Sequence, residues 1–185
     1  VLEAAFPYRA GNETLADLSS SRLHPELFRA LTEDGAHRRY RFSADLKPYE
    51  HQLEAWRILG DPTPQSVLVT SGTGSGKTEC FLVPLLNDLA GEVDRSGRLS
   101  GVRAIALYPL NALIASQQER LREWTAPFGG RIRFGLYNGD MPEDSKSGTA
   151  PLEQVSDRRT LRSDPPPILV TNVTMLEYMT VRHQD

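Results

Sequence analysis

The sequence lacks several features by which whole classes of protein are recognised. It has one cysteine, Cys80, which excludes an internal disulfide and a zinc site built from several cysteines. No apolar run approaches the roughly 20 residues that span a bilayer. The first residues, VLEAAFPYRAGNETL, have neither the basic nor the apolar segment of a secretory signal. We therefore expect a cytoplasmic protein without membrane segments.

An excess of charge of one sign is also missing. The formal net charge is −3, so the chain is not a basic nucleic-acid coat, and any nucleic-acid contact must be local. Apolar residues make up 39% and charged residues 24% of the 185 residues, which is the composition of an ordinary globular domain with a sizeable core. The chain does not begin with Met, so we expect it to be a piece of a longer protein.

What the sequence does contain is the run SGTGSGKT at residues 71–78, between the apolar runs 67–69 and 81–83. A strand, a glycine-rich turn and a helix start are the context of a phosphate-binding P-loop. The glycines let the backbone approach phosphate, and N–H groups at the helix N-terminus point toward it. We expect catalytic roles for Lys77, on the β/γ-phosphates, and Thr78, on Mg²⁺. The predicted ATP-binding residues of this segment are Ser71, Gly72, Thr73, Gly74, Ser75, Gly76, Lys77, Thr78 and Glu79. The first motif position is Ser71 rather than Gly, a mild departure.

Around this motif, strand patterns alternate with helix patterns, which predicts an α/β fold with a parallel sheet covered by helices on both faces. The predicted strands are 67–70, 102–108, 131–137 and 168–171. The predicted helices are 23–31, one from Pro48 to Gly60, 77–90, 111–125 and 173–182, with a short one within 152–162 and a loop at 140–151. We divide the chain into an N-terminal extension, 1–44, and an ATP-binding lobe, 45–185.

Further segments narrow the choice among P-loop proteins. LKPYEHQLEAW, upstream of the P-loop, resembles the Q motif of superfamily 2 helicases, whose glutamine reads the adenine edge; Gln52 holds that position. Gln52 could instead be an ordinary helix-surface glutamine. In the family an upstream aromatic residue stacks on adenine, and Tyr40 and Phe42 are the candidates here, although both could be core residues.

ALYPLNALIASQ resembles motif Ia, and PPILVTNVTMLEYM resembles motif Ic, of the same superfamily. YNGD at 137–140 matches its Tyr-x-Gly-Asp pattern. The resemblance implies that nucleic acid is contacted at these strand ends, with Pro109, Leu110, Asn111, Thr171 and Asn172 as the contact residues. A plain strand-to-helix turn would also tolerate Pro-Leu-Asn.

Taken in order, the motifs resemble superfamily 2 DEAD/DEAH-type helicases, most nearly the large bacterial DNA helicases of repair and phage-defence systems such as DISARM and Druantia. The resemblance implies a P-loop NTPase (RecA-like) lobe that uses ATP and Mg²⁺. It also implies DNA, rather than RNA, and a second RecA-like lobe as partners.

The acidic DEAD/DEAH box of that family is not found in the sequence. The pairs Glu33-Asp34 and Glu143-Asp144 lie in polar segments, so we interpret them as solvated surface. We therefore expect a lobe truncated before the DEAH strand and inactive alone. The alternative is a P-loop scaffold or interaction module that no longer hydrolyses ATP. A small-molecule P-loop kinase fits less well, because it gives no role to Gln52 or Asn172.

Overall fold

The computed structural model describes residues 8–33, 40–63, 65–109, 111–145 and 151–181. Within these residues four parallel strands form one sheet in the order β1-β4-β2-β3. The strands are β1 (Ala104–Leu107), β2 (Phe134–Tyr137), β3 (Gln154–Val155) and β4 (Ile168–Thr171). β4 is central, and its Val170 is level with Ala106 of β1 and Leu136 of β2. The predicted strand 168–171 is confirmed, while 102–108 and 131–137 are each shorter than predicted.

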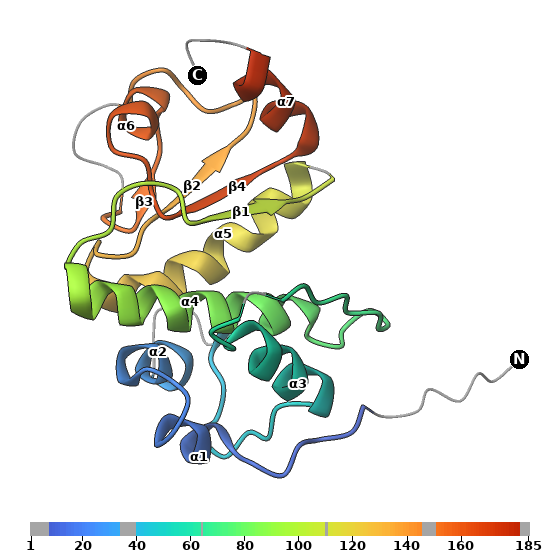
Figure 1. Cartoon of the computed structure of the whole chain (residues 1–185). Helices are drawn as coiled ribbons and strands as arrows, with labels where there is room; N and C mark the ends of the chain where they lie inside the picture. The colour runs from blue at the N-terminus through green and yellow to red at the C-terminus, as the bar shows by residue number, and fades with distance from the viewer. Residues whose placement is uncertain (1–7, 34–39, 64, 110, 146–150, 182–185) are drawn as a thin grey trace, which may run out of the picture.

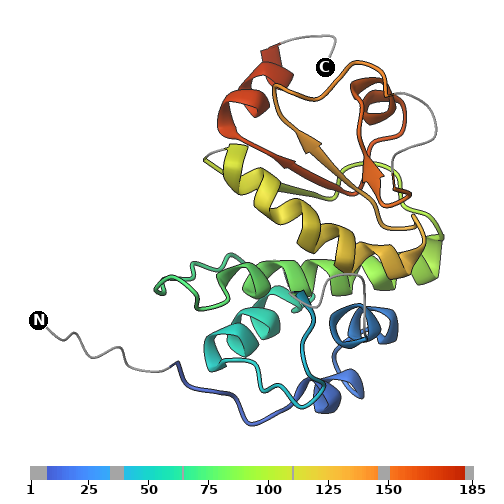
Figure 2. The same ribbon diagram turned by 180° about the vertical axis from the view of Figure 1, so that it is seen from behind.

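Helices cover both faces of the sheet (Figures 1 and 2). Ile168 and Val170 of β4 belong to a large apolar cluster with α5 (Asn111–Thr125) and α4 (Lys77–Ser96). Leu169 belongs to a second cluster with residues of α6 (Arg158–Ser163) and α7 (Val173–Val181). Because neighbouring residues of a strand point to opposite faces, this division confirms the predicted α/β architecture.

The first helices pack on the side of α4 that faces away from the sheet (Figure 1). They are α1 (Leu15–Ser19), α2 (Pro25–Thr32) and α3 (Glu50–Leu59). Leu15 and Leu27 are buried in the same cluster as Leu86 of α4. A short 3-10 helix, η2 (Ala126–Phe128), ends α5 and adds Phe128 to that cluster. The N-terminal extension thus forms one core with the helices under the sheet.

The predicted strand 67–70 is wrong. The segment pairs with no strand among the described residues, and the side chain of Leu68 is 88% exposed. Its sequence is suited to a strand, but a strand exists only where a neighbour supplies hydrogen bonds. Two smaller differences accompany it: α4 continues to Ser96 rather than ending near residue 90, and 152–162 contains the short strand β3 before the helix α6. In the part of the chain described, no helix is long and apolar enough to cross a membrane.

Candidate nucleotide-binding site

The P-loop forms the turn that leads into α4. Gly74 and Gly76 have φ of 75° and 73°, values that side-chain-bearing residues rarely adopt. Gly76 is the N-cap of α4, and no side chain caps the helix. The first N–H groups of a 20-residue helix are therefore left without a side-chain acceptor. The loop thus presents backbone donors and the positive end of a helix dipole, which suits an anion such as a phosphate chain.

Lys77 lies within this loop. Its ammonium donates to the carbonyl of Ser71 at 2.9 Å and to the carbonyl of Gly72. The Ser71 and Ser75 hydroxyls are 2.6 Å apart, and Ser75 is buried. The cation is therefore held by neutral carbonyl oxygens, which a phosphate could replace with stronger charge-assisted bonds.

Three side chains of α3 bond to the P-loop and to the first turn of α4 that follows it. Gln52 donates to the carbonyl of Gly76 at 3.1 Å and accepts from the N–H of Tyr49 at 2.9 Å. His51 Nε2 lies 2.9 Å from the carbonyl of Ser75. Gln52 is buried, and a Cβ at residue 76 would collide with its amide, so glycine is required there on two grounds. Gln52 is thus placed against the P-loop rather than on an open helix surface.

The third side chain, Trp56, was not predicted as a site residue. Its indole N–H donates to the carbonyl of Glu79 at 2.8 Å. Trp56 follows Gln52 by four positions on α3, and residues spaced by four share a helix face. This spacing indicates that Trp56 lies on the same face of α3 as Gln52, and the sequence could therefore have predicted its contact with the start of α4.

A cavity of about 320 Å³ opens beside Gln52 and the P-loop glycines. Phe42 and Leu46 form part of its apolar wall, together with Gly74 and Gly76. Of the two aromatic candidates for stacking on adenine, Phe42 thus lines this cavity. Tyr40 is buried, and the guanidinium of Arg120 lies 5.4 Å from the centre of its ring.

Glu79 also lines this cavity, and its carboxylate is paired with a basic residue of α5. It forms an ion pair with Arg120 of α5 at 3.3 Å, and both side chains are mostly buried. Sequence reasoning grouped Glu79 with the nucleotide-binding residues and missed Arg120. No local sequence pattern predicts a role for Arg120 at this site, because its partner lies on a different helix.

The residues predicted to contact nucleic acid meet where β1 and β4 end. Asn172 donates to the side chain of Asn111 at 2.8 Å, which joins the start of α7 to the start of α5. Pro109 is exposed, and Leu110 lies outside the described residues. Thr171 is fully buried, and its hydroxyl donates to the carbonyl of Tyr137 at 2.7 Å. The structure therefore brings Asn111 and Asn172 together and turns the Thr171 side chain into the sheet.

A model of the DEAD/DEAH box helicase family matches residues 49–184, most of the chain. The chain belongs to the DEAD/DEAH box helicase family. This confirms the resemblance drawn from the four motifs.

Relatives of this helicase chain are much longer than the chain itself. The Druantia protein DruE of Escherichia coli is 39% identical over 52% of this chain and 6% of its own length. An uncharacterized ATP-dependent helicase of Methanocaldococcus jannaschii, MJ1574, is 27% identical over 76% of this chain and 18% of its own. The chain therefore spans less than a fifth of either relative.

A solved structure gives the same fold. The DUF1998 helicase MrfA, bound to DNA, matches with a TM-score of 0.62 and 24% identity, over 95% of this chain and 20% of that one. At this identity the match supports the fold, and it includes the helices that precede the matched helicase residues. The fold of this helicase chain is therefore the RecA-like helicase fold.

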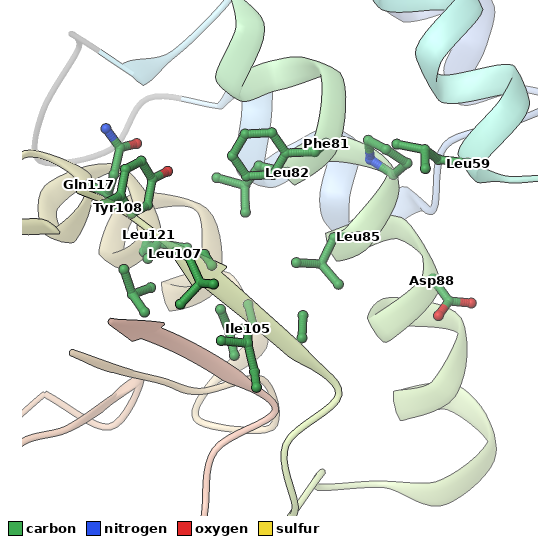
Figure 3. A pocket seen from close by; sticks show the side chains of 15 residues that line it. Leu59, Phe81, Leu82, Leu85, Asp88, Ile105, Leu107, Tyr108, Gln117 and Leu121 are labelled. Carbon is green, nitrogen blue, oxygen red and sulfur yellow. The ribbon is translucent and has the colours of Figure 1, made fainter. Parts of the chain in front are cut away.

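A groove of about 520 Å³ separates the helicase chain's α4 from β1 (Figure 3). Phe81 and Leu85 of α4 lie on one side, and Ile105 and Leu107 of β1 on the other. Ile105 is 50% exposed, although it lies in a strand. β1 pairs only with β4 among the described strands, so its other edge is open. The groove and the open edge together leave an apolar surface between helix and sheet.

Proposed function

We propose that the chain is the ATP-binding part of the first motor lobe of an ATP-dependent DNA helicase or translocase. The observation that carries the proposal is the P-loop itself, residues 71–78, lying over the uncapped N-terminus of α4 and bonded by side chains of α3. Membership of the DEAD/DEAH box helicase family supports it.

The residues of the loop fit a nucleotide triphosphate. The ammonium of Lys77 would exchange the carbonyls of Ser71 and Gly72 for β- and γ-phosphate oxygens. The hydroxyl of Thr78 would contribute to holding Mg²⁺, together with the phosphates. When bound, ATP with Mg²⁺ supplies the phosphoanhydride bond whose hydrolysis drives movement. Glu79 belongs to the same site through its backbone, which Trp56 anchors.

We place the base at the cavity beside Gln52. There the amide would exchange one of its present bonds, to Tyr49 or Gly76, for the adenine edge. Phe42 would stack on the base from the apolar wall. Such a site prefers adenine over guanine, because guanine presents an acceptor where adenine presents an amino group.

We place the nucleic acid at the edge where β1 and β4 end. Ligands of open parallel sheets bind outside the carboxyl ends of the strands. Pro109, Asn111 and Asn172 are there, and amide groups grip phosphates without reading bases. Thr171 would act through the backbone at this edge, since its hydroxyl is engaged inside the sheet. DNA is the proposed substrate because MrfA was solved with DNA and DruE belongs to a Druantia system. We also propose a role in phage defence or DNA repair, in the cytoplasm, as the resemblance drawn from the sequence motifs implies.

The groove between α4 and β1 supports the proposal that a further strand completes the lobe. A strand added at the open edge of β1 would cover Ile105 and Leu107 and give the segment 67–70 a sheet to join. We place the acidic box on such a strand. Without that box, residues 1–185 alone would bind ATP without hydrolysing it, because the box would supply the second metal ligand and the group that orients water.

Binding of a fluorescent ATP analogue tests the proposal. Lys77→Ala removes the loop's cation, and we expect affinity to fall by about tenfold or more, as for a lost charge-assisted bond. Arg95→Ala is the matched control, because Arg95 is an exposed cation in the last turn of the same helix. Equal affinities in wild type and Lys77→Ala would contradict the P-loop assignment. They would favour the alternative that the chain is a scaffold or interaction module.

A further inference from the structure

The carboxylate of Glu79 lies close to the P-loop. One of its oxygens would be 3.2 Å from a Cβ placed on Gly76, and its side chain is 13% exposed. Glu79 follows Lys77 by two residues, so it moves with the first turn of α4. A change in the position or charge of the loop therefore changes the electrostatic environment of this carboxylate.

Its partner Arg120 is poorly satisfied apart from this ion pair. The guanidinium lies 5.4 Å from the centre of the Tyr40 ring and 5.6 Å from that of Trp124. Its Nε and Nη1 atoms are buried and have no hydrogen-bond partner among the residues that the structure describes. The contact with Glu79, at 3.3 Å, is thus electrostatic rather than a well-aligned hydrogen bond. The guanidinium therefore keeps donors that a better-placed acceptor could use.

Arg120 belongs to the helix that begins at the strand-end edge. α5 starts at Asn111, which bonds to Asn172 of the neighbouring connection. The rise of 1.5 Å per residue places Arg120 about 14 Å along the helix from Asn111. One rigid helix therefore connects the neighbourhood of the P-loop to the edge at which we place nucleic acid.

We propose that the Glu79–Arg120 ion pair couples the nucleotide site to the nucleic-acid edge, with Arg120 as a positioning residue. This inference rests on the proposed function and deepens it. A triphosphate in the loop adds several negative charges close to the Glu79 carboxylate. Repulsion of that carboxylate and attraction of the Arg120 guanidinium both change the pair, and α5 carries the change to Asn111.

Such coupling requires that the interaction energy of the Glu79–Arg120 pair differs between the empty loop and the nucleotide-bound loop. A mostly buried ion pair meets it, because charges in a low-dielectric environment interact several times more strongly than at the surface. Linkage then demands reciprocity: if nucleotide changes the affinity for nucleic acid by some factor, nucleic acid changes the affinity for nucleotide by the same factor.

The test is a binding cycle on the full protein. The affinity for a non-hydrolysable ATP analogue is measured with and without a single-stranded oligonucleotide, and the ratio is the coupling factor. Couplings of this kind are typically about 5- to 150-fold. We expect Arg120→Gln and Glu79→Gln each to bring the ratio close to one, and the double variant to lower it no further.

Arg122→Gln is the matched control. Arg122 lies on the same helix and pairs with Glu153 at 3.7 Å, but it is far more exposed, so the ratio should match wild type. A ratio that Arg120→Gln leaves intact would overturn the proposal, even if both affinities fall, because a merely structural role weakens both arms equally. If one single variant does not fold, the other decides the question. A wild type that binds neither ligand would instead count against the proposed function, whereas binding of both without coupling would count against this inference alone.

Discussion

Two tetrapeptides of this chain are almost the same in sequence and different in structure. Residues 67–70 read VLVT and β4 reads ILVT. β4 is buried along its whole length and paired with strands on both sides. The first segment is unpaired, and its Leu68 is among the most exposed apolar side chains. Such a sequence therefore permits a strand, and the presence of neighbouring strands decides whether one forms.

Hydrogen exchange should show the largest difference between the two segments. Amides in the β4 ladder exchange only through opening of the sheet, which costs about 5 kcal/mol or more in a stable domain. Amides of 67–70 lack ladder bonds and should exchange at once, about a thousandfold faster or more. Mass spectrometry of peptic fragments measures both segments in one experiment. Slow exchange at Val69 and Thr70 in this chain would contradict the unpaired state.

Truncation of the equivalent leucines sharpens the same comparison. Leu169→Ala opens a cavity at a buried position of β4 and should cost about 2–5 kcal/mol of unfolding free energy. Leu68→Ala is the matched control, and we expect a change within about 0.5 kcal/mol, as for surface positions. Urea titration followed by circular dichroism gives both values. Similar losses in the two variants would mean that 67–70 is packed in solution.

The smallest expected effect concerns the entry to β4. Asp164 accepts bonds from Arg98, Ser100 and Arg133, and the bond from Arg98 contributes most to lowering its pKa to about 2. Asp164→Asn should destabilise the fold by about 1–3 kcal/mol at neutral pH, since it leaves the buried Arg133 without its charge partner.

The pH dependence has a definite sign. The pKa of Asp164 is lower in the folded chain than its ordinary value of 3.8, so its contribution is fully present above that value. It is lost as the pH falls toward 2. The difference in Tm between wild type and Asp164→Asn should therefore shrink over that range. Asp144→Asn, in an exposed pair with Arg159, should differ little from wild type at any pH. A gap between wild type and Asp164→Asn that stays constant down to pH 2 would contradict the assigned ion pair.

Much of the fold could be predicted from local pattern. The helix 111–125 and the strand 168–171 were predicted to the residue, because each is an apolar pattern bounded by turn residues. The segment 67–70 has an equally clear pattern and was wrong, because pairing depends on residues elsewhere in the chain. The sequence of 67–70 does not show whether a neighbouring strand is present to pair with it.

The candidate site divides in the same way. The glycine-rich turn is local, so the spacing of Gly74, Gly76 and Lys77 predicted that it leads into a helix at Lys77. The direction of the Thr171 hydroxyl depends on the carbonyl of Tyr137, and the partner of Glu79 is Arg120 on another helix. Those contacts arise only when distant segments pack together, and no sequence window contains both members.

The open edge of β1 also has a consequence for the behaviour of the chain in solution. An unpaired strand edge beside exposed apolar side chains such as Ile105 and Leu107 is a template on which another chain can add a strand. At the concentrations used for crystallisation or NMR, copies of this chain can therefore join edge to edge into aggregates. A charged residue at position 105, the usual natural defence of an exposed edge, would oppose such pairing.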